Sequence, residues 1–158
     1  MLDVGCGTGS LAIAASERVG PEAKVHGIDA SPEMIERARN KAAKRRSGAT
    51  FTEAVVEEMP FPDAQFDVVL CTMMLHHLPR SAREQCAREM RRVLKPGGSA
   101  MVVEFGRDGK SFIERLHRHG ALKLSHIHEL LESAGFVVAE SGPVEAQALN
   151  FIRATAPD

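Results

Sequence analysis

Short apolar runs alternate with amphipathic segments along most of the 158 residues, and this alternation restricts the fold more than any other feature. It is typical of repeated β-α units, which build a mostly parallel sheet covered by helices. The apolar runs predict strands over residues 1–4, 24–29, 50–54, 66–71, 99–105, 137–141 and 148–156. The segments between them predict helices over residues 9–20, 31–46, 81–94 and 125–136. We therefore expect an α/β fold.

Capping and turn residues mark where several of these elements begin and end. Ser31 is a good N-cap, and Pro32 suits the first position of a helix. The "KPGG" run at residues 95–98 should end the third helix before the next strand begins. Gly142 and Pro143 should join the last two strands.

Charge and cysteine content exclude several classes of protein. The formal net charge of −1 gives no electrostatic argument for binding nucleic acid or an anionic membrane. No apolar run approaches the roughly 20 residues of a membrane helix, and the start has no secretory signal pattern. Cys6, Cys71 and Cys86 form no C-x-x-C pair, so we expect small packing residues and no metal site. We predict one cytoplasmic domain over residues 1–158, without a nucleic-acid partner or stable membrane insertion.

A glycine-rich turn, "DVGCGTGSL", lies between the first strand and the first helix. Its glycines let the backbone approach a ligand closely, and the helix start presents unpaired N–H groups. A P-loop is excluded because no lysine occurs before residue 24. The dinucleotide pattern G-x-G-x-x-G would need glycine where Ser10 stands. Asp29, at the end of the second strand, is placed to hold ribose hydroxyls, so the ligand should carry a ribose.

Four ordered motifs, "LDVGCGTGSLA", "GIDASPEMIERAR", "EEMPFPDAQFDVVLCTMMLHHLP" and "RVLKPGG", resemble those of class I S-adenosylmethionine-dependent methyltransferases. The similarity is to the ubiquinone and menaquinone biosynthesis branch, with a type 11 methyltransferase domain. It implies a Rossmann-like three-layer sandwich with sheet order 3-2-1-4-5-7-6 and an antiparallel last strand. It also implies a cofactor-binding core over residues 1–105 and a variable acceptor-side segment, with the final strands, over residues 106–158.

The resemblance assigns S-adenosyl-L-methionine as the cofactor, and it places each part of that molecule. The methionine part would lie by the first turn, the ribose at the second strand, the adenine after the third strand and the sulfonium after the fourth. The implied binding residues are, in that order, Asp3, Gly5, Gly7, Thr8 and Gly9; Asp29 and Ala30; Val55, Val56 and Glu57; and Thr72. Relatives often have Asp or Asn where Val55 stands, so a polar contact to adenine is lost here.

Histidine is the natural general base for an O- or C-methyltransferase, whereas an amine acceptor needs none. His76 follows the fourth strand, at the mouth of the family's active site, and is the catalytic candidate; helix-start packing is the alternative. The H-x-H pairs at residues 117–119 and 126–128 lack the spacing of a chelate on a helix, so we expect no metal there. Residues 111–124 predict an amphipathic cover on the sheet or a lid for an apolar acceptor.

We expect a methyltransferase that acts on a small, apolar acceptor such as a quinone, a lipid or another metabolite. The alternatives are a non-catalytic or truncated cofactor-binding remnant and, more weakly, an NAD-dependent oxidoreductase. The family usually has an N-terminal helical segment before the first strand. Because the turn here begins at Gly5, we expect a cofactor site that is open on one side, with weak binding, unless a homodimer or another partner covers it.

Overall fold

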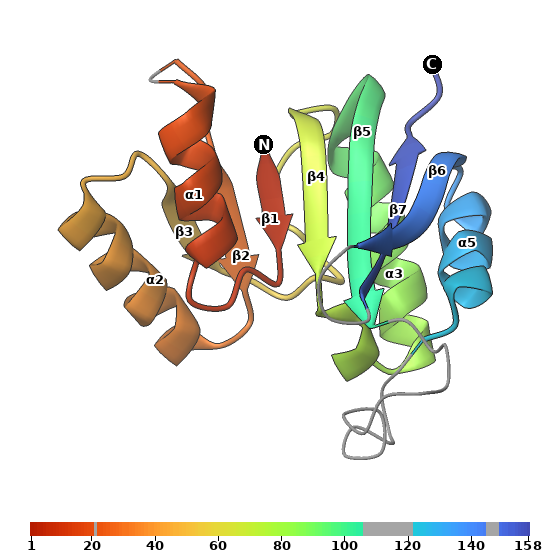
Figure 1. Ribbon diagram of the computed structural model, residues 1–158, viewed down its shortest axis with the longest axis horizontal. Helices are drawn as coiled ribbons and strands as arrows, with labels where there is room; N and C mark the ends of the chain where they lie inside the picture. The colour runs from red at the N-terminus through yellow and green to blue at the C-terminus, as the bar shows by residue number, and fades with distance from the viewer. Residues whose placement is uncertain (21, 106–121, 145–148) are drawn as a thin grey trace.

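The computed structural model describes residues 1–20, 22–105, 122–144 and 149–158, and these form a seven-stranded sheet in the order β3-β2-β1-β4-β5-β7-β6 (Figure 1). The strands are β1 (Leu2–Val4), β2 (His26–Asp29), β3 (Thr50–Glu53), β4 (Phe66–Thr72), β5 (Leu94–Phe105), β6 (Val137–Val144) and β7 (Leu149–Thr155). The predicted fold class and strand order are confirmed.

The short strand β1 lies at the centre of the sheet. Val4 is in register with Ile28 of β2 and with Cys71 of β4, and both pairings are parallel. Strands β1 to β5 all run in one direction, while β7 is antiparallel to β5 and β6. The carboxyl ends of the first five strands therefore meet at one edge, the lower edge in Figure 1. This carboxyl edge is where ligands bind in open α/β sheets.

Four α-helices and a 3₁₀ turn are described: α1 (Ser10–Val19), α2 (Pro32–Arg45), η1 (Leu75–His77), α3 (Arg80–Val93) and α5 (Leu124–Ser133). Helix α2 begins as predicted, since the Ser31 hydroxyl accepts the N–H of Met34 and Pro32 occupies the first position. Helix α5 begins one residue earlier than the sequence suggests, at Leu124. The rest of the predicted amphipathic segment, residues 111–121, lies outside the described residues, as does the 117–119 histidine pair.

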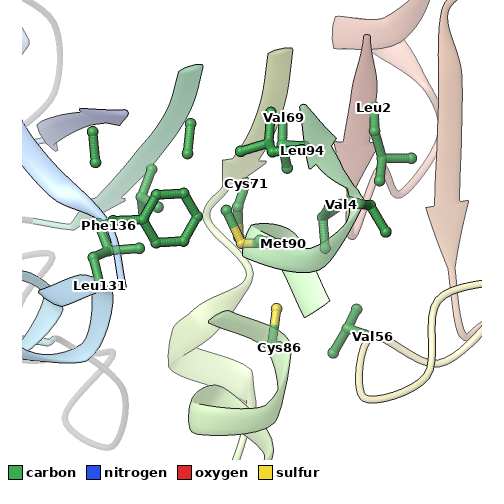
Figure 2. Close-up of a cluster of buried hydrophobic side chains, with 14 of the residues drawn as sticks. Leu2, Val4, Val56, Val69, Cys71, Cys86, Met90, Leu94, Leu131 and Phe136 are labelled. Atoms are coloured by element: carbon green, nitrogen blue, oxygen red, sulfur yellow. The ribbon is translucent and has the colours of Figure 1, made fainter. Parts of the chain in front are cut away.

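Each face of the sheet has its own apolar core. Cys86, Met90, Leu131 and Phe136 pack from the α3 and α5 side against alternate residues of the strands, such as Cys71 (Figure 2). On the other side, α1 and α2 bury a separate cluster that includes Ile13, Ile35 and Phe51. The helices thus cover both faces, as expected for a three-layer sandwich.

Helix α3 ends at Val93, just before the "KPGG" run, as predicted. The expected start of the next strand at Ser99 and the expected end of β6 before Gly142 are wrong, because the strands continue through these positions. The "KPGG" run belongs to β5: Leu94 pairs with Phe66, and the register shifts before Val68 pairs with Ser99. Pro143 lies within β6, opposite Asn150, instead of ending the strand. Because β6 is the last strand of the sheet, the missing N–H of proline interrupts no ladder on its outer side.

Candidate functional site

The glycine turn passes so close to neighbouring elements that side chains are excluded at two positions. Gly5 has a φ of 71°, and a Cβ there would overlap Cγ of Met74. Gly9, with a φ of 73°, directly precedes α1, and a Cβ there would lie 2.6 Å from the ring of Phe51. Both conformations are left-handed and suit glycine. The turn therefore holds the start of α1, with its unpaired N–H groups, against the carboxyl edge.

Asp29 connects the glycine turn to the ends of β2 and α2. Its Oδ2 accepts the N–H of Gly7 at 2.9 Å, and its Oδ1 accepts the N–H of Ser31 at 2.9 Å. A carboxylate has about four lone-pair sites, so these two bonds leave acceptor capacity for further hydroxyl donors. Ala30, beside it, is exposed. The predicted ribose position is therefore rigid and still able to accept hydrogen bonds.

Asp3 is a buried carboxylate just below the turn. Neither of its oxygens has a hydrogen-bond partner among the described residues, and the residue is 1% exposed. Burial raises its pKa to about 6, and the charge of Asp29 adds to this rise. The backbone N–H of Ala12 opposes the shift without reaching hydrogen-bond geometry. An unsatisfied buried carboxylate is costly, and a bound cationic group would relieve it.

Thr8 presents its hydroxyl to α2. Lys41 donates to the hydroxyl oxygens of both Thr8, at 2.8 Å, and Ser10, at 2.9 Å. The side chain of Thr8 therefore braces the turn, and its backbone is the part that remains for a ligand. Lys41 was not predicted as a site residue, and no sequence motif indicates that it contacts the turn.

The predicted adenine segment follows β3. Val55 is 51% exposed, whereas Val56 is buried in the core on the α3 side, so only the backbone of Val56 can reach a ligand. Glu57 is half-buried. The exposed Val55 offers an apolar surface at the position where the polar adenine contact is missing.

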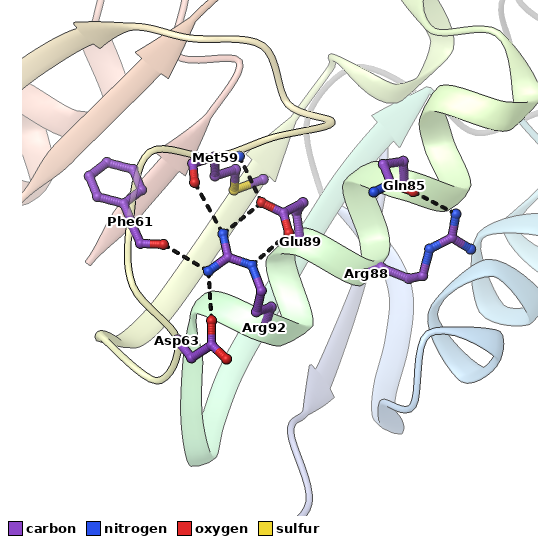
Figure 3. Close-up of polar contacts among 7 residues, drawn as sticks. All are labelled: Met59, Phe61, Asp63, Gln85, Arg88, Glu89 and Arg92. Carbon is purple, nitrogen blue, oxygen red and sulfur yellow. Dashed lines mark hydrogen bonds and ion pairs between the residues drawn. The ribbon is translucent and has the colours of Figure 1, made fainter.

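A charged clamp on α3 holds the end of this segment (Figure 3). Glu89 accepts the N–H of Met59 at 2.7 Å, and Arg92 donates to the carbonyls of Met59 and Phe61 and to the carboxylates of Glu89 and Asp63. The hydrogen bond from Arg92 lowers the pKa of Glu89, and Glu89 in turn raises that of Arg92. From the sequence, Glu89 and Arg92 were predicted only to belong to a helix.

Backbone strain occurs where β4 ends. Met73 follows Thr72, the predicted sulfonium neighbour, and has a φ of 52°, which is unusual for a residue with a side chain. Its N–H bonds to the carbonyl of Val103 at 2.7 Å, and its side chain is 40% exposed. Strained residues of this kind cluster at functional sites.

His76, the catalytic candidate, lies in η1, three residues after Met73. Its Nδ1 lies 2.8 Å from Oε2 of Glu104, and its backbone N–H donates to Oε1 of the same carboxylate at 3.3 Å. Glu104 is 1% exposed. Glu104 was not predicted from the sequence, although an acidic residue near the carboxyl end of an apolar strand is a usable signal. His77 is exposed, and its ring lies 4.0 Å from the His76 ring at a tilt of 43°.

The cysteines behave as packing residues. Burial raises the pKa of Cys6 and of Cys86 to about 12 and that of Cys71 well above its usual value. Thiols of this kind are poor nucleophiles.

Further from the glycine turn, α3 and α5 border a cleft of about 580 Å³ lined by Arg80, Arg83, Glu84 and His126. Within the described ranges, no group of three or more His, Cys, Asp or Glu side chains could hold a metal ion. In the same ranges, no helix is long and apolar enough to cross a membrane. His126 is exposed, and His128 lies 3.2 Å from the Ser141 hydroxyl.

Comparison with known proteins agrees with this geometry. A family profile described as a methyltransferase domain matches residues 1–98. The demethylmenaquinone methyltransferase of Deinococcus radiodurans is 38% identical over 105 residues, which cover 66% of this chain and 42% of that protein. The ubiquinone/menaquinone biosynthesis C-methyltransferase UbiE of Hahella chejuensis is 34% identical over 119 residues, covering 74% and 47%. The chain thus spans about half the length of these curated relatives.

Solved structures share the fold. An S-adenosylmethionine-dependent methyltransferase from Methanosarcina mazei superposes with a TM-score of 0.85 at 22% identity, covering 99% of this chain and 91% of that one. The [4+2]-cyclase SpnF gives the same TM-score and identity, covering 99% and 73%. A cyclase among these neighbours shows that the fold alone does not define the reaction. Because the family profile covers most of the chain and the sheet order agrees with it, this protein belongs to the class I S-adenosylmethionine-dependent methyltransferases.

Proposed function

We propose that the chain binds S-adenosyl-L-methionine at the carboxyl edge and transfers its methyl group to a small-molecule acceptor. The observation that carries this proposal is the bond between Gly7 and Asp29, which sets a ribose-binding carboxylate beside the glycine turn. This pair lies within the residues that match the methyltransferase domain.

The residues at this edge fit the parts of the cofactor. The unpaired carboxylate of Asp3 suits its ammonium group, and the backbone from Gly5 to Gly9 would surround the methionine part. Asp29 and Ala30 would hold the ribose. The segment Val55–Glu57 would lie along the adenine, and Thr72 would lie near the sulfonium.

When bound, the sulfonium cofactor supplies an electrophilic methyl group with an activated leaving group. The chain therefore needs mainly to position the acceptor and to exclude water. Three features would hold the backbone of the site in place for positioning: the glycine turn, the hydrogen bonds of Asp29 and the α3 clamp.

The acceptor is proposed to be small and apolar. The two curated relatives described above are named for menaquinone or ubiquinone methylation, which suggests a quinone-like compound for this chain. Leu11, Val55 and Met73 each expose an apolar side chain and each follows a strand that ends at the carboxyl edge. Exposed apolar side chains close to these strand ends favour an apolar acceptor.

Calorimetric titration with S-adenosylhomocysteine tests the cofactor assignment. At a hundredfold excess over Kd, the ligand should stabilise the fold by about 2.7 kcal/mol. Asp29→Ala should weaken binding at least about tenfold, because hydrogen bonds to a charged group are lost. Glu36→Ala removes an exposed carboxylate elsewhere on α2 and should change affinity less than about twofold.

The same titration separates the alternatives. Binding of NAD in place of S-adenosylhomocysteine would support an oxidoreductase. Binding of S-adenosylhomocysteine without turnover of any acceptor would support a non-catalytic role. Failure to bind either compound would overturn the proposal.

A homodimer or other partner is also proposed, over the sheet face that carries α1 and α2. Val69 and Cys71 of β4 point into the α3 core, so the alternate residue Leu70 points to the opposite face, where it is half-buried. Met101 and Val103 of β5 are half-buried in the same alternating pattern. Light scattering of the purified chain would detect the dimer, and cell fractionation would test the proposed cytoplasmic location.

A further inference from the structure

We propose that His76 and Glu104 form a proton-accepting pair, and that the acceptor carries an ionisable hydroxyl on an unsaturated ring. This inference rests on the methyl transfer proposed above and names its acceptor class. The carboxylate of Glu104 receives both the ring Nδ1 and the backbone N–H of His76, at 2.8 and 3.3 Å.

The hydrogen bonds assign the tautomer of the imidazole. Both carboxylate oxygens of Glu104 lie within hydrogen-bond distance of His76. The backbone N–H of His76 can only donate, so this carboxylate acts as an acceptor. Nδ1 therefore carries the ring proton, and Nε2 keeps a lone pair. No described residue is within hydrogen-bond distance of Nε2, so it is available to a bound molecule.

The pair lies at the proposed methyl-transfer site. His76 follows β4, and Met74, two residues earlier, contacts Gly5 of the glycine turn. Glu104 follows Val103, which is in register with Thr72. Glu104 therefore lies on β5 and His76 in the turn after β4, and these two strands end beside the predicted sulfonium position.

The surroundings keep the pair largely dry. The side chains of His76 and Glu104 are 12% and 2% exposed, and the ring of Phe105 packs edge-on against His76 at 5.6 Å. Among the described residues, the ionisable groups near the pair include His77, whose ring lies 4.0 Å from that of His76, and Arg83 of α3, which donates to the carbonyl of Leu75. They also include the buried thiol of Cys71, whose pKa is raised by burial and by the charge of Glu104. A carboxylate buried on one side of an imidazole stabilises the positive charge that forms when the other side takes a proton.

The chemistry of the base selects the acceptor. Nε2 takes the hydroxyl proton, and the freed electron pair, on oxygen or on the conjugated ring carbon, forms the bond to the methyl carbon. When the ring carbon is methylated, the hydrogen on that carbon is then lost to water as a proton, and its electron pair restores the aromatic ring. The carbon–sulfur bond breaks, and its electrons remain on sulfur. Glu104 balances the charge of the resulting imidazolium. A neutral amine would need no such base, so the dyad favours phenols and hydroquinones over amines.

Anaerobic methylation of 1,4-naphthohydroquinone, with benzylamine as the comparison acceptor, tests the inference. Mass spectrometry of the product distinguishes an O-methyl from a C-methyl group, and either supports the acceptor class. His76→Asn keeps a donor toward Glu104 but has no base, so turnover should fall at least about 100-fold. The affinity of the His76→Asn variant for S-adenosylhomocysteine should stay within about twofold of the native value, because neither His76 nor Glu104 is assigned to the cofactor. The control His77→Asn, at the exposed neighbour, should change turnover less than about threefold.

A second measurement does not depend on turnover. Nitrogen NMR of the chain labelled with ¹⁵N-histidine, at a pH where the imidazole is neutral, should show the proton of His76 on Nδ1. Glu104→Leu should return the ring to the Nε2–H form. Proton on Nε2 in the native chain, unchanged turnover in His76→Asn, or methylation of the amine alone would each overturn the inference. If S-adenosylhomocysteine does not bind the native chain, the proposed function itself fails; if it binds and these results follow, only the dyad fails.

Discussion

The backbone N–H of Gly7 donates to Oδ2 of Asp29 at 2.9 Å, so the glycine turn and the end of β2 form one unit. The other carboxylate oxygen receives the N–H of Ser31, which caps α2. A single side chain thus links the starts of two helices at the edge where a ligand would bind.

Replacement of Asp29 should therefore loosen the ligand-free fold as well as weaken binding. Asp29→Asn places an amide N–H₂ against one of the two backbone donors, and we expect a loss of about 1 to 2 kcal/mol in unfolding free energy. Urea denaturation without ligand measures this loss. An unchanged midpoint would show that the two hydrogen bonds contribute nothing to stability.

Two glycines of the turn should respond differently to alanine. Both have positive φ, but a Cβ at Gly5 would overlap Met74, whereas a Cβ at Gly7 would meet nothing within 4 Å. Gly7→Ala should cost about 1 kcal/mol from backbone strain alone, and Gly5→Ala clearly more. Thermal denaturation of both variants gives the comparison.

A double variant separates the two contributions at Gly5. Adding Met74→Ala to the Gly5→Ala variant should recover the stability that is lost through overlap with the Met74 side chain. The loss that comes from the positive φ of the backbone should remain. If the double variant is no more stable than the sum of the single effects predicts, the contact with Met74 is not the cause.

Asp3 should make the ligand-free chain less stable as the pH rises. Its pKa is about 6 in the fold against an ordinary value of 3.8, so between these values the folded state holds more protons than the unfolded state. The stabilisation that protonated Asp3 gives the fold is fully present below pH 3.8 and is lost as the pH rises through about 6. The unfolding free energy falls by roughly 3 kcal/mol at most over this range.

Asp3→Asn checks this pH dependence. The variant should flatten the stability profile between these pH values and weaken binding of S-adenosylhomocysteine, because the partner of its ammonium group is gone. Urea unfolding across the pH range gives the first result and calorimetry the second. A variant profile as steep as that of the native chain would exclude Asp3 as the titrating group.

The α3 clamp offers a matched pair of arginines on one helix. Arg92 bonds to Glu89, Asp63 and two loop carbonyls, whereas the hydrogen bond of Arg88 within the described part of the chain goes to Gln85 at the surface (Figure 3). Arg92→Ala should lower the unfolding free energy by about 2 kcal/mol. This loss is smaller than that for a fully buried ion pair, because the Arg92 side chain is 31% exposed to solvent. Arg88→Ala should cost less than about 0.5 kcal/mol.

The clamp also predicts a change in binding. Because Arg92 holds the loop that follows Val56, its loss should weaken binding of S-adenosylhomocysteine, and Arg88→Ala should not. Urea unfolding and calorimetry of the two variants provide both readouts. Equal effects of the two substitutions would contradict a specific role for the clamp.

Many features of the fold are visible in the sequence because adjacent residues determine them. Ser31 and Pro32 predict the start of α2, and the glycine spacing with Asp29 predicts both the turn and the edge where it lies. The strand order followed from the family resemblance. The end of α3 before residues 95–98 is confirmed. The strand boundaries expected at residues 95–98 and at Pro143 are wrong, because pairing with neighbouring strands outweighed local turn preferences.

By itself, the sequence determined the series of strands and helices, the glycine turn and the acidic residue beside it, since periodicity and backbone preference act over a few neighbouring positions. Only the tertiary structure decided that Lys41 braces Thr8, that Arg92 clamps the loop at Met59, and that Glu104 lies behind His76. These partners are 33, 33 and 28 residues apart. Their contacts depend on the alignment of whole strands and helices, which brings distant polar groups together where burial makes each hydrogen bond count.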